Sequence, residues 1–353
     1  MALDPVFTVT YWGVTGTLTA PLKPAEVTDK VVRAITTLVE QGRLAGLQPG
    51  PDLRARVLQQ VEQGLPFPLR STFGGNTTCV EIKTPDALLI FDCGSGCREL
   101  GIDLDRRWNA PGYQGQRAAH VLLTHPHLDH ALAAPYVGPF YDSRNSFTIW
   151  GSDTVLKAMR AVLGSESALA HTYFPPSIDL MKALKDIRQI QAGMTFAIGS
   201  TQITTYALRH PGSCLAYRLE NAGRVFVFAT DHEQATVPDL ELAAFAHGAD
   251  VLYTEGQYLQ AEYDGMQLLP GETTHVARRG WGHSPVEACV STAVAAAVKS
   301  LHVGHREPMR TDEQIFAIEG LIQKLMTDEL RHAGRDPNSC QALIPYEGMT
   351  FQL

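Results

Sequence analysis

The 353-residue sequence lacks several features that would place it in a specialised class of protein. It has no uninterrupted apolar run of about 18 residues, the length that a membrane-spanning helix needs. Its first residues lack the basic and apolar regions of a secretion signal, and no internal repeat or low-complexity tract interrupts it. We therefore expect a globular protein of the cytoplasm that does not associate with a membrane.

The sequence also lacks cysteine pairs that could form a disulfide framework or a zinc ribbon. Its six cysteines are scattered, and only Cys93 and Cys97 lie close together, without a second pair at metal-binding spacing. We expect reduced, mostly buried thiols that take no part in metal binding.

Positive charge is scarce as well, with 29 Lys and Arg against 37 Asp and Glu and a formal net charge of −8. This balance disfavours a surface built to hold nucleic acid or anionic lipid, so we predict that long nucleic acid is not a partner. Hydrophobic residues make up 44% and charged residues 19%, as in ordinary globular proteins. We predict a single domain over residues 1–353, because a chain of this length can bury one large core.

The chain does contain an alternation of strands and helices, which predicts an α/β fold. Short apolar runs predict strands, and each is followed within a few residues by His, Asp or Glu. Loops that follow strands are rigidly held and exposed, which suits a functional site. The runs are 121–123, 225–229, 251–253 and 301–303.

Residues at about 21–70 differ from this pattern, because Val27, Val31 and Ile35 recur at helical spacing before a PGP break and a second such run. We predict an inserted helical hairpin near the N-terminus, and a C-terminal helix and strand over residues 306–353. The insertion can serve as a lid over a pocket or as a dimer contact, and we expect a homodimer.

Residues Thr124–His130 read THPHLDH and place three imidazoles and one carboxylate within six residues, directly after a predicted strand. Zinc and similar ions bind neutral imidazole nitrogens and carboxylate oxygens. On an extended loop His125 and His127 point to one side, while Asp129 and His130 point to another. Because four such groups would be costly to bury without a partner, the loop predicts two neighbouring divalent metal ions.

This THxHxDH loop resembles the signature of the metallo-β-lactamase superfamily. The resemblance implies a four-layer αββα sandwich with two metal ions where the sheets meet. It also implies that His210 completes the first metal site, that Asp231 bridges both ions and that His305 completes the second site. The implied ligands are His125, His127, Asp129, His130, His210, Asp231 and His305.

Three further segments resemble the branch of ribonuclease Z and the small cyclic phosphodiesterases, namely GGNTT at 74–78, FDCGSG at 91–96 and GWGHSPVEA at 280–288. This likeness implies that His283 is a catalytic acid near the leaving group and that Glu255 orients it. Asp129 would serve catalysis as well as metal binding. Ser284 and Glu287 predict a capping box directly after His283.

The resemblance implies a dinuclear-metal phosphodiesterase that hydrolyses a small phosphodiester, such as a cyclic nucleotide, by a metal-bridging hydroxide with a His general acid. Zinc is the expected metal, and manganese or iron also accept such ligands. Ser213, Arg218 and Arg306 are candidate phosphate contacts. The alternatives are a tRNA 3′-processing endonuclease, a hydrolase of C–N, lactone or thioester bonds, and a binding protein without catalysis.

Overall fold

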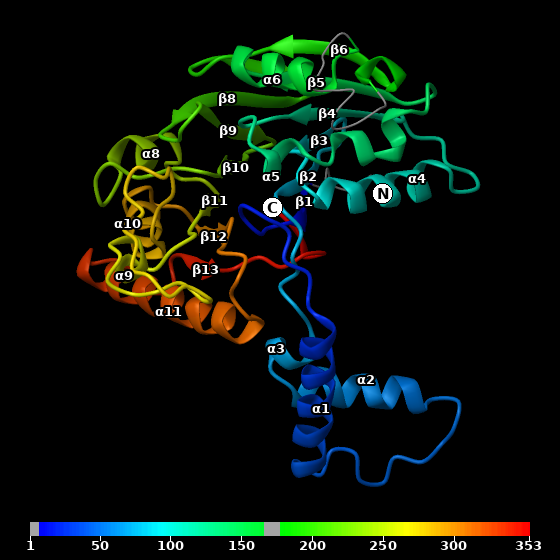
Figure 1. Cartoon of the computed structure of the whole chain (residues 1–353), viewed down its shortest axis with the longest axis vertical. Coiled ribbons are helices and arrows are strands. Elements are labelled where there is room, and N and C mark those ends of the chain that lie inside the picture. The colour runs from blue at the N-terminus through cyan, green and yellow to red at the C-terminus, as the bar shows by residue number, and fades with distance from the viewer. Residues whose placement is uncertain (1–6, 166–176) are drawn as a thin grey trace.

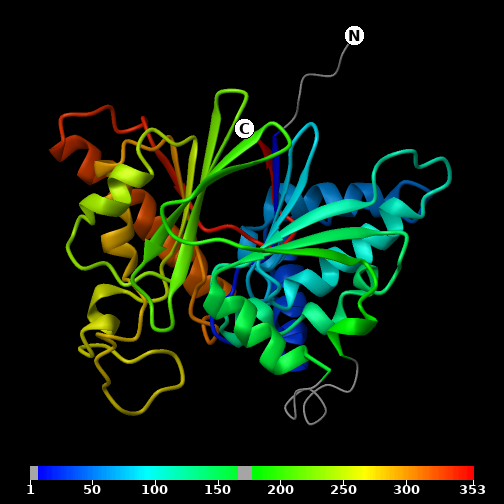
Figure 2. The same ribbon diagram turned by 90° about the horizontal axis from the view of Figure 1, so that it is seen from above.

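The computed structural model describes residues 7–165 and 177–353, and its centre is a pair of facing seven-stranded sheets. Helices cover the outer face of each sheet, as Figure 2 shows. This is the predicted αββα sandwich. In the described ranges, no helix has both the length and the apolar composition to cross a membrane.

The first sheet has antiparallel pairing among the four strands at one edge and parallel pairing among the strands beyond them. Helices α4 (Gly96–Trp108) and α6 (Asp153–Leu163) lie on its outer face. The strand order is β14 (Thr350–Gln352), β1 (Thr8–Gly13), β2 (Cys79–Lys83), β3 (Leu88–Phe91), β4 (Ala118–Leu122), β5 (Ser146–Gly151) and β6 (Leu184–Gln189).

The second sheet repeats this division, with parallel pairing from β10 to β13 and antiparallel pairing from β7 to β10. Its strand order is β13 (Gln341–Leu343), β12 (Ser300–Gly304), β11 (Val251–Glu255), β10 (Arg224–Ala229), β9 (Cys214–Asn221), β8 (Thr201–Leu208) and β7 (Thr195–Ile198). Its helices are α8 (Leu240–Phe245), α9 (Gln260–Tyr263), α10 (Val286–Ala295) and α11 (Asp312–His332).

Three apolar layers hold these elements together. One layer fills the space between the sheets, where side chains such as Phe91, Tyr217 and Phe228 are fully buried. The other two pack each sheet against its own helices. Central strands such as β11 and β12 are buried over most of their length, as in sheets covered on both faces, whereas β1 and β8 alternate between buried and more exposed residues. The six cysteines are free and buried, as expected.

The predicted helical hairpin forms an arm, which we define as residues 21–70. It contains α1 (Pro24–Glu40), α2 (Leu53–Gly64) and α3 (Phe67–Arg70), and α1 and α2 project away from the sandwich (Figure 1). The Lys30 ammonium ties α1 to the body, since it pairs with the buried Asp312 carboxylate and donates a hydrogen bond of 2.8 Å to the Ser71 carbonyl.

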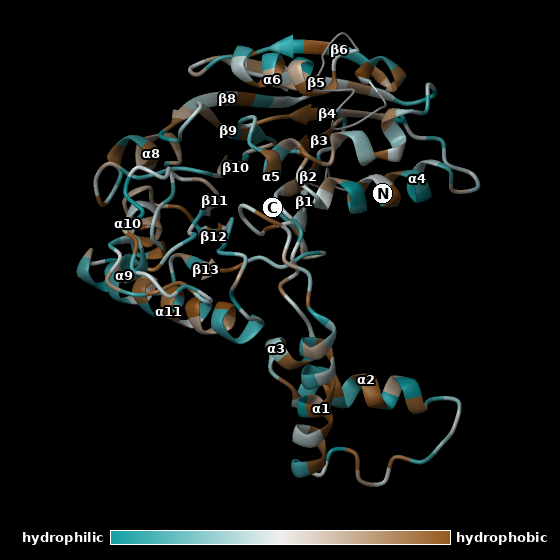
Figure 3. Ribbon diagram, viewed as in Figure 1, coloured by the Kyte–Doolittle hydropathy of each residue, from teal (hydrophilic) through white to brown (hydrophobic). Residues whose placement is uncertain are grey.

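The arm exposes several apolar residues, and Figure 3 colours parts of the α1 ribbon brown, for hydrophobic. Only Leu38 of α1 is buried, because the arm packs against the body mainly near its base. The exposed large apolar residues of α1 are Val27, Val31, Val32, Ile35 and Val39.

The C-terminal segment differs from the predicted helix and strand, because two short strands follow α11 rather than one. Strand β13 joins the second sheet beside β12, whereas β14 joins the first sheet beside β1. The segment therefore links the free edges of both sheets, and the Leu353 amide donates a 2.9 Å hydrogen bond to the Phe7 carbonyl.

Candidate metal centre

The predicted site residues come together at one edge of the sandwich, where strands from both sheets end. The THPHLDH residues follow β4, with Asp129 and His130 in the short helix α5 (Leu128–Ala131). The second sheet contributes His210 between β8 and β9, Asp231 after β10 and His305 after β12. Carboxyl ends of parallel strands are the usual place for sites in open α/β sheets.

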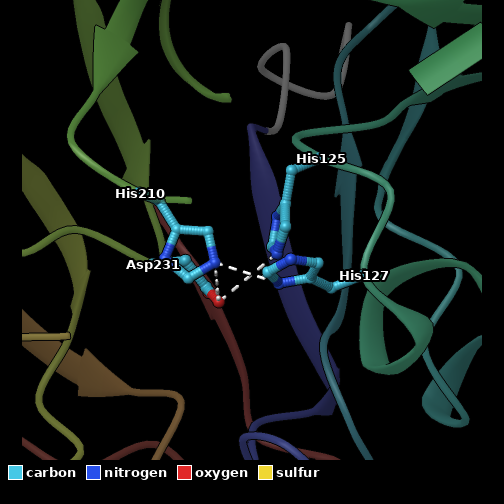
Figure 4. Close-up of side chains that lie close together, drawn as sticks. All are labelled: His125, His127, His210 and Asp231. Atoms are coloured by element: carbon cyan, nitrogen blue, oxygen red, sulfur yellow. Dashed lines mark hydrogen bonds and ion pairs between the residues drawn. The ribbon is translucent and has the colours of Figure 1, made fainter. Parts of the chain in front are cut away.

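A first group contains His125, His127, His210 and Asp231, whose nearest side-chain nitrogen and oxygen atoms all lie within 4.8 Å of one another. Figure 4 shows the three imidazoles and the carboxylate converging from different loops. The Asp231 Oδ2 atom lies 3.5 Å from His125 Nε2 and 3.7 Å from His210 Nε2. Three imidazoles and a carboxylate around one point are a typical zinc-ligand set.

A second group contains Asp129, His130, Asp231 and His305, again within 4.8 Å of one another. His130 Nε2 lies 3.3 Å from Asp129 Oδ2 and 3.3 Å from Asp231 Oδ1. His305 Nε2 lies 3.1 Å from Asp129 Oδ2. Asp231 belongs to both groups, because its Oδ2 atom lies 3.3 Å from His305 Nε2 as well as close to His125 and His210, so the arrangement can hold two ions with a shared carboxylate.

The state of the buried imidazoles fits metal binding. The Nε2 atoms of His125 and His130 are buried without a hydrogen-bond partner in the described chain, an arrangement that is costly unless an ion binds there. Burial lowers the pKa of His210 to about 4 and that of His125 well below its usual value. Both are therefore neutral near pH 7, which is the form that binds metals.

Neighbouring groups orient these imidazoles. The buried Asp92 carboxylate accepts hydrogen bonds from the Thr124 amide at 2.8 Å and from His130 Nδ1 at 2.8 Å. The Gly282 carbonyl likewise accepts from His210 Nδ1 at 2.9 Å. Each contact leaves the Nε2 atom of the imidazole free to face the cluster. The positive φ of 62° at Asp92 shows that this turn is shaped around its contacts.

The loop after β1 also contributes, although no pattern that we identified in the sequence predicted its role. The Thr17 amide donates a 2.8 Å hydrogen bond to Asp129 Oδ2. Gly16 lies against His305, since a Cβ atom at this position would sit 2.5 Å from His305 Nδ1. The only local signal is a glycine in the run of β-branched residues after Gly13, which indicates a close backbone approach.

His283 lies beside both groups, with its ring centroid 5.1 Å from those of His210 and His305. Its Nδ1 atom lies 3.5 Å from Oε2 of Glu255, which is fully buried at the end of β11. Burial alone would lower the pKa of His283, but the nearby carboxylates, Glu255 first, outweigh it and raise the pKa to about 9. Sequence reasoning thus paired these two residues correctly in space.

The predicted capping box after His283 is wrong. Helix α10 begins at Val286 with Pro285 in the capping position. The Ser284 hydroxyl instead donates to the His232 carbonyl at 2.5 Å, and the Ser284 amide donates to Glu255 Oε1 at 2.5 Å. Ser284 therefore secures the turn that carries His283 rather than the helix.

The three candidate phosphate contacts differ in position. Arg218 does not lie where the prediction requires. It is on β9, about 13 Å along the strand from Cys214 at the site. Its guanidinium binds Glu220 and two backbone carbonyl groups near α8. Arg306 is only 5% exposed, and its Nη2 atom donates to the Gly74 carbonyl, whereas its buried Nη1 atom has no hydrogen-bond partner among the described residues. Ser213 is exposed beside His210 and stays a candidate.

Comparisons with known proteins agree with this geometry. The chain is 28% identical over 237 residues to Ribonuclease TTHA0252 of Thermus thermophilus, covering 62% of this chain and about half (51%) of that relative. Yeast PDE1 superposes with a TM-score of 0.58 at 10% identity, covering 99% of this chain and 100% of that one. A diphosphatase of the PhnP family superposes with a TM-score of 0.57 at 13% identity, covering 98% of each chain.

A family profile gives the assignment. Residues 88–305 match the Beta-lactamase superfamily domain, and this range includes all seven residues of the two side-chain groups. The match spans more than half of the chain, and the sandwich and the edge position of the site fit it. The chain therefore belongs to the beta-lactamase superfamily, with the metallo-β-lactamase fold.

Proposed function

We propose that this protein is a dinuclear-metal phosphodiesterase that hydrolyses a small phosphodiester, with cyclic nucleotides among the candidate substrates. The observation that carries the proposal is the shared position of Asp231 between two ligand groups, with His283 beside both. A site for two adjacent cations suits a reaction in which negative charge develops on a phosphoryl group.

The metals in this proposal are two divalent ions, with zinc as our first choice because imidazoles dominate the ligands; manganese and iron are the other choices. His125, His127, His210 and Asp231 would hold one ion. Asp129, His130, Asp231 and His305 would hold the other. When bound, such ions supply Lewis-acid activation of water and neutralise charge on phosphoryl oxygens.

Residues of the chain itself would protonate the leaving group. Nδ1 of His283 faces Glu255, so its Nε2–H is free to donate a proton to the departing alkoxide. Glu255 fixes the ring and favours its protonated form. The Ser284 contacts hold the same turn and keep His283 beside the cluster.

The names of the relatives support phosphorus chemistry, since a ribonuclease and a diphosphatase both cleave bonds to phosphorus. They do not support the expectation that long nucleic acid is excluded. Although the net charge is −8, the ribonuclease match makes RNA cleavage the second candidate function. Hydrolysis of C–N, lactone or thioester bonds is the third.

The test compares one set of substrates on metal-free protein and on protein reloaded with zinc. We expect zinc-dependent turnover of bis(p-nitrophenyl) phosphate and of at least one cyclic nucleotide. Asp231→Asn should abolish it, whereas Asp328→Asn on the exposed face of α11 should not. Faster cleavage of a tRNA precursor would favour RNA processing, and turnover of nitrocefin or an acyl-lactone without phosphodiester turnover would overturn the proposal.

Two expectations from the sequence remain predictions. A homodimer would be detected by light scattering, and a cytoplasmic location by fractionation of the source cells.

A further inference from the structure

Trp281 differs from Trp108 and Trp150 in its exposure, because 52% of its surface is exposed whereas those two are 4% and 5% exposed. It lies two residues before His283. Exposure of an indole next to a candidate active site suits contact with a ligand, since an aromatic face left in water is otherwise unfavourable.

The backbone around Trp281 is held on both sides by one carboxylate. Glu233 accepts a 2.7 Å hydrogen bond from the Gly280 amide and a 2.8 Å hydrogen bond from the Gly282 amide. The Tyr263 hydroxyl donates to the same carboxylate at 2.6 Å and fixes it in turn. The indole is therefore exposed on a rigid turn rather than on a loose loop.

The side chain of Trp281 is supported from within. The guanidinium of Arg278 lies 5.7 Å from the Trp281 ring and 5.4 Å from the Tyr258 ring. Arg278 is fully buried, and its charge is held by Glu272 and by the Glu262 carbonyl. The cation restricts the indole by an interaction with its ring, and the exposed part of the ring remains open to solvent.

The turn also contacts the candidate metal centre directly. Gly282 accepts the hydrogen bond from His210 Nδ1, and a Cβ atom on Gly282 would lie 2.2 Å from that nitrogen. Tyr258 meets His283 edge to face, with ring centroids 6.2 Å apart. Trp281 is thus fixed to the same residues that orient His210 and His283.

We propose, on the basis of the phosphodiesterase function above, that Trp281 is a stacking platform for an aromatic substituent of the substrate, a nucleobase, while the metal centre binds its phosphate. Stacking on an aromatic side chain accepts any base, because every base has a π-face. A platform that is already rigid loses little entropy when the ligand binds.

The test measures binding, so it is independent of turnover. Isothermal titration calorimetry on zinc-loaded protein gives the dissociation constants of 5′-AMP and of ribose 5-phosphate, which share the phosphate and sugar but differ in the base. We expect wild-type protein to bind 5′-AMP about tenfold more tightly. Trp281→Leu should abolish this preference, and Trp281→Phe should retain most of it.

Leucine preserves an apolar cover over Arg278, so Trp281→Leu separates loss of the aromatic face from loss of packing. Tyr346→Leu is the matched control, because Tyr346 is 36% exposed and packs against Phe67 of the arm. It should leave the preference unchanged. An equal preference for 5′-AMP over ribose 5-phosphate in wild-type protein and in Trp281→Leu would overturn the proposal that Trp281 stacks on the base. Absence of hydrolysis of bis(p-nitrophenyl) phosphate would instead overturn the proposed function, which distinguishes the two failures.

Discussion

The proposed chemistry depends on a few side chains, namely the seven proposed ligands and His283 beside them. The seven proposed ligands follow from the THPHLDH loop and from the resemblance, because those residue types at those positions have few other uses. Arg218 was mispredicted, since proximity in sequence to His210 says nothing about which face of β9 its side chain occupies. Gly16 and Thr17 were missed because their contacts depend on how the two sheets pack.

Replacement of His283 should affect substrates according to their leaving group. His283→Asn should lower kcat about 100-fold to 10,000-fold for a cyclic nucleotide, whose leaving alkoxide needs a proton. The loss should be much smaller for bis(p-nitrophenyl) phosphate, because p-nitrophenolate leaves readily without one. Steady-state kinetics on both substrates provide the measurement. His332→Asn, at the exposed end of α11, serves as the control. Equal losses on both substrates would argue against a proton donor.

Gly16→Ala should impair one metal position selectively. The added methyl group would lie 2.5 Å from His305 Nδ1 and would force this ring away from Asp129 and Asp231. We expect about half of the wild-type metal content by elemental analysis after dialysis. Gly320→Ala has open space at its Cβ and should keep full content. Full metal content in Gly16→Ala would show that the loop after β1 does not position His305.

At the level of elements, periodicity predicted the hairpin helices closely, yet it did not predict how far they stand from the sandwich. An apolar stripe at helical spacing normally faces a core. Here the stripe on α1 is largely exposed, since Leu38 is the one buried residue of this helix. Local sequence defines the amphipathic face of a helix but not the surface that covers it.

Negative charge introduced among the exposed apolar residues of α1 should test whether the arm forms the contact of the expected dimer. Val31 and Ile35 are 51% and 52% exposed, so Val31→Glu with Ile35→Glu should be compatible with folding. If the stripe is the contact, these changes should convert a dimer into a monomer in light scattering. Ile102→Glu, on α4 at 53% exposure, controls for added charge. A monomeric wild-type protein would refute the prediction.

At the scale of the whole molecule, the alternation of strands and helices predicted an α/β fold, and the resemblance carried by the signature loop implied the four-layer sandwich. The assignment of each strand to a sheet was not, since it depends on packing between distant segments. The proposed ligands come from loops of both sheets, so the metal centre forms only when the two sheets are docked. Metal binding and global stability should therefore be linked.

Removal of metal should lower the unfolding temperature of the entire sandwich. A ligand that binds only the folded state stabilises it by about 4 kcal/mol at about 1,000 times its dissociation constant. Differential scanning calorimetry with and without a chelator should show a single transition that moves down by several degrees and returns when zinc is added. The unfolding temperature of the Asp231→Asn variant should differ little between the two conditions. A metal-independent transition in wild type would contradict this linkage.

The pairing of β14 with β1 has a consequence for biosynthesis. Residues 8–10 pair with residues 350–352, so the edge of the first sheet is completed by a segment that leaves the ribosome more than 300 residues later. Until then β1 presents unpaired backbone groups on that side, which can recruit other nascent chains. Emergence of residues 350–352, rather than of the signature loop, is therefore the event that closes this sheet.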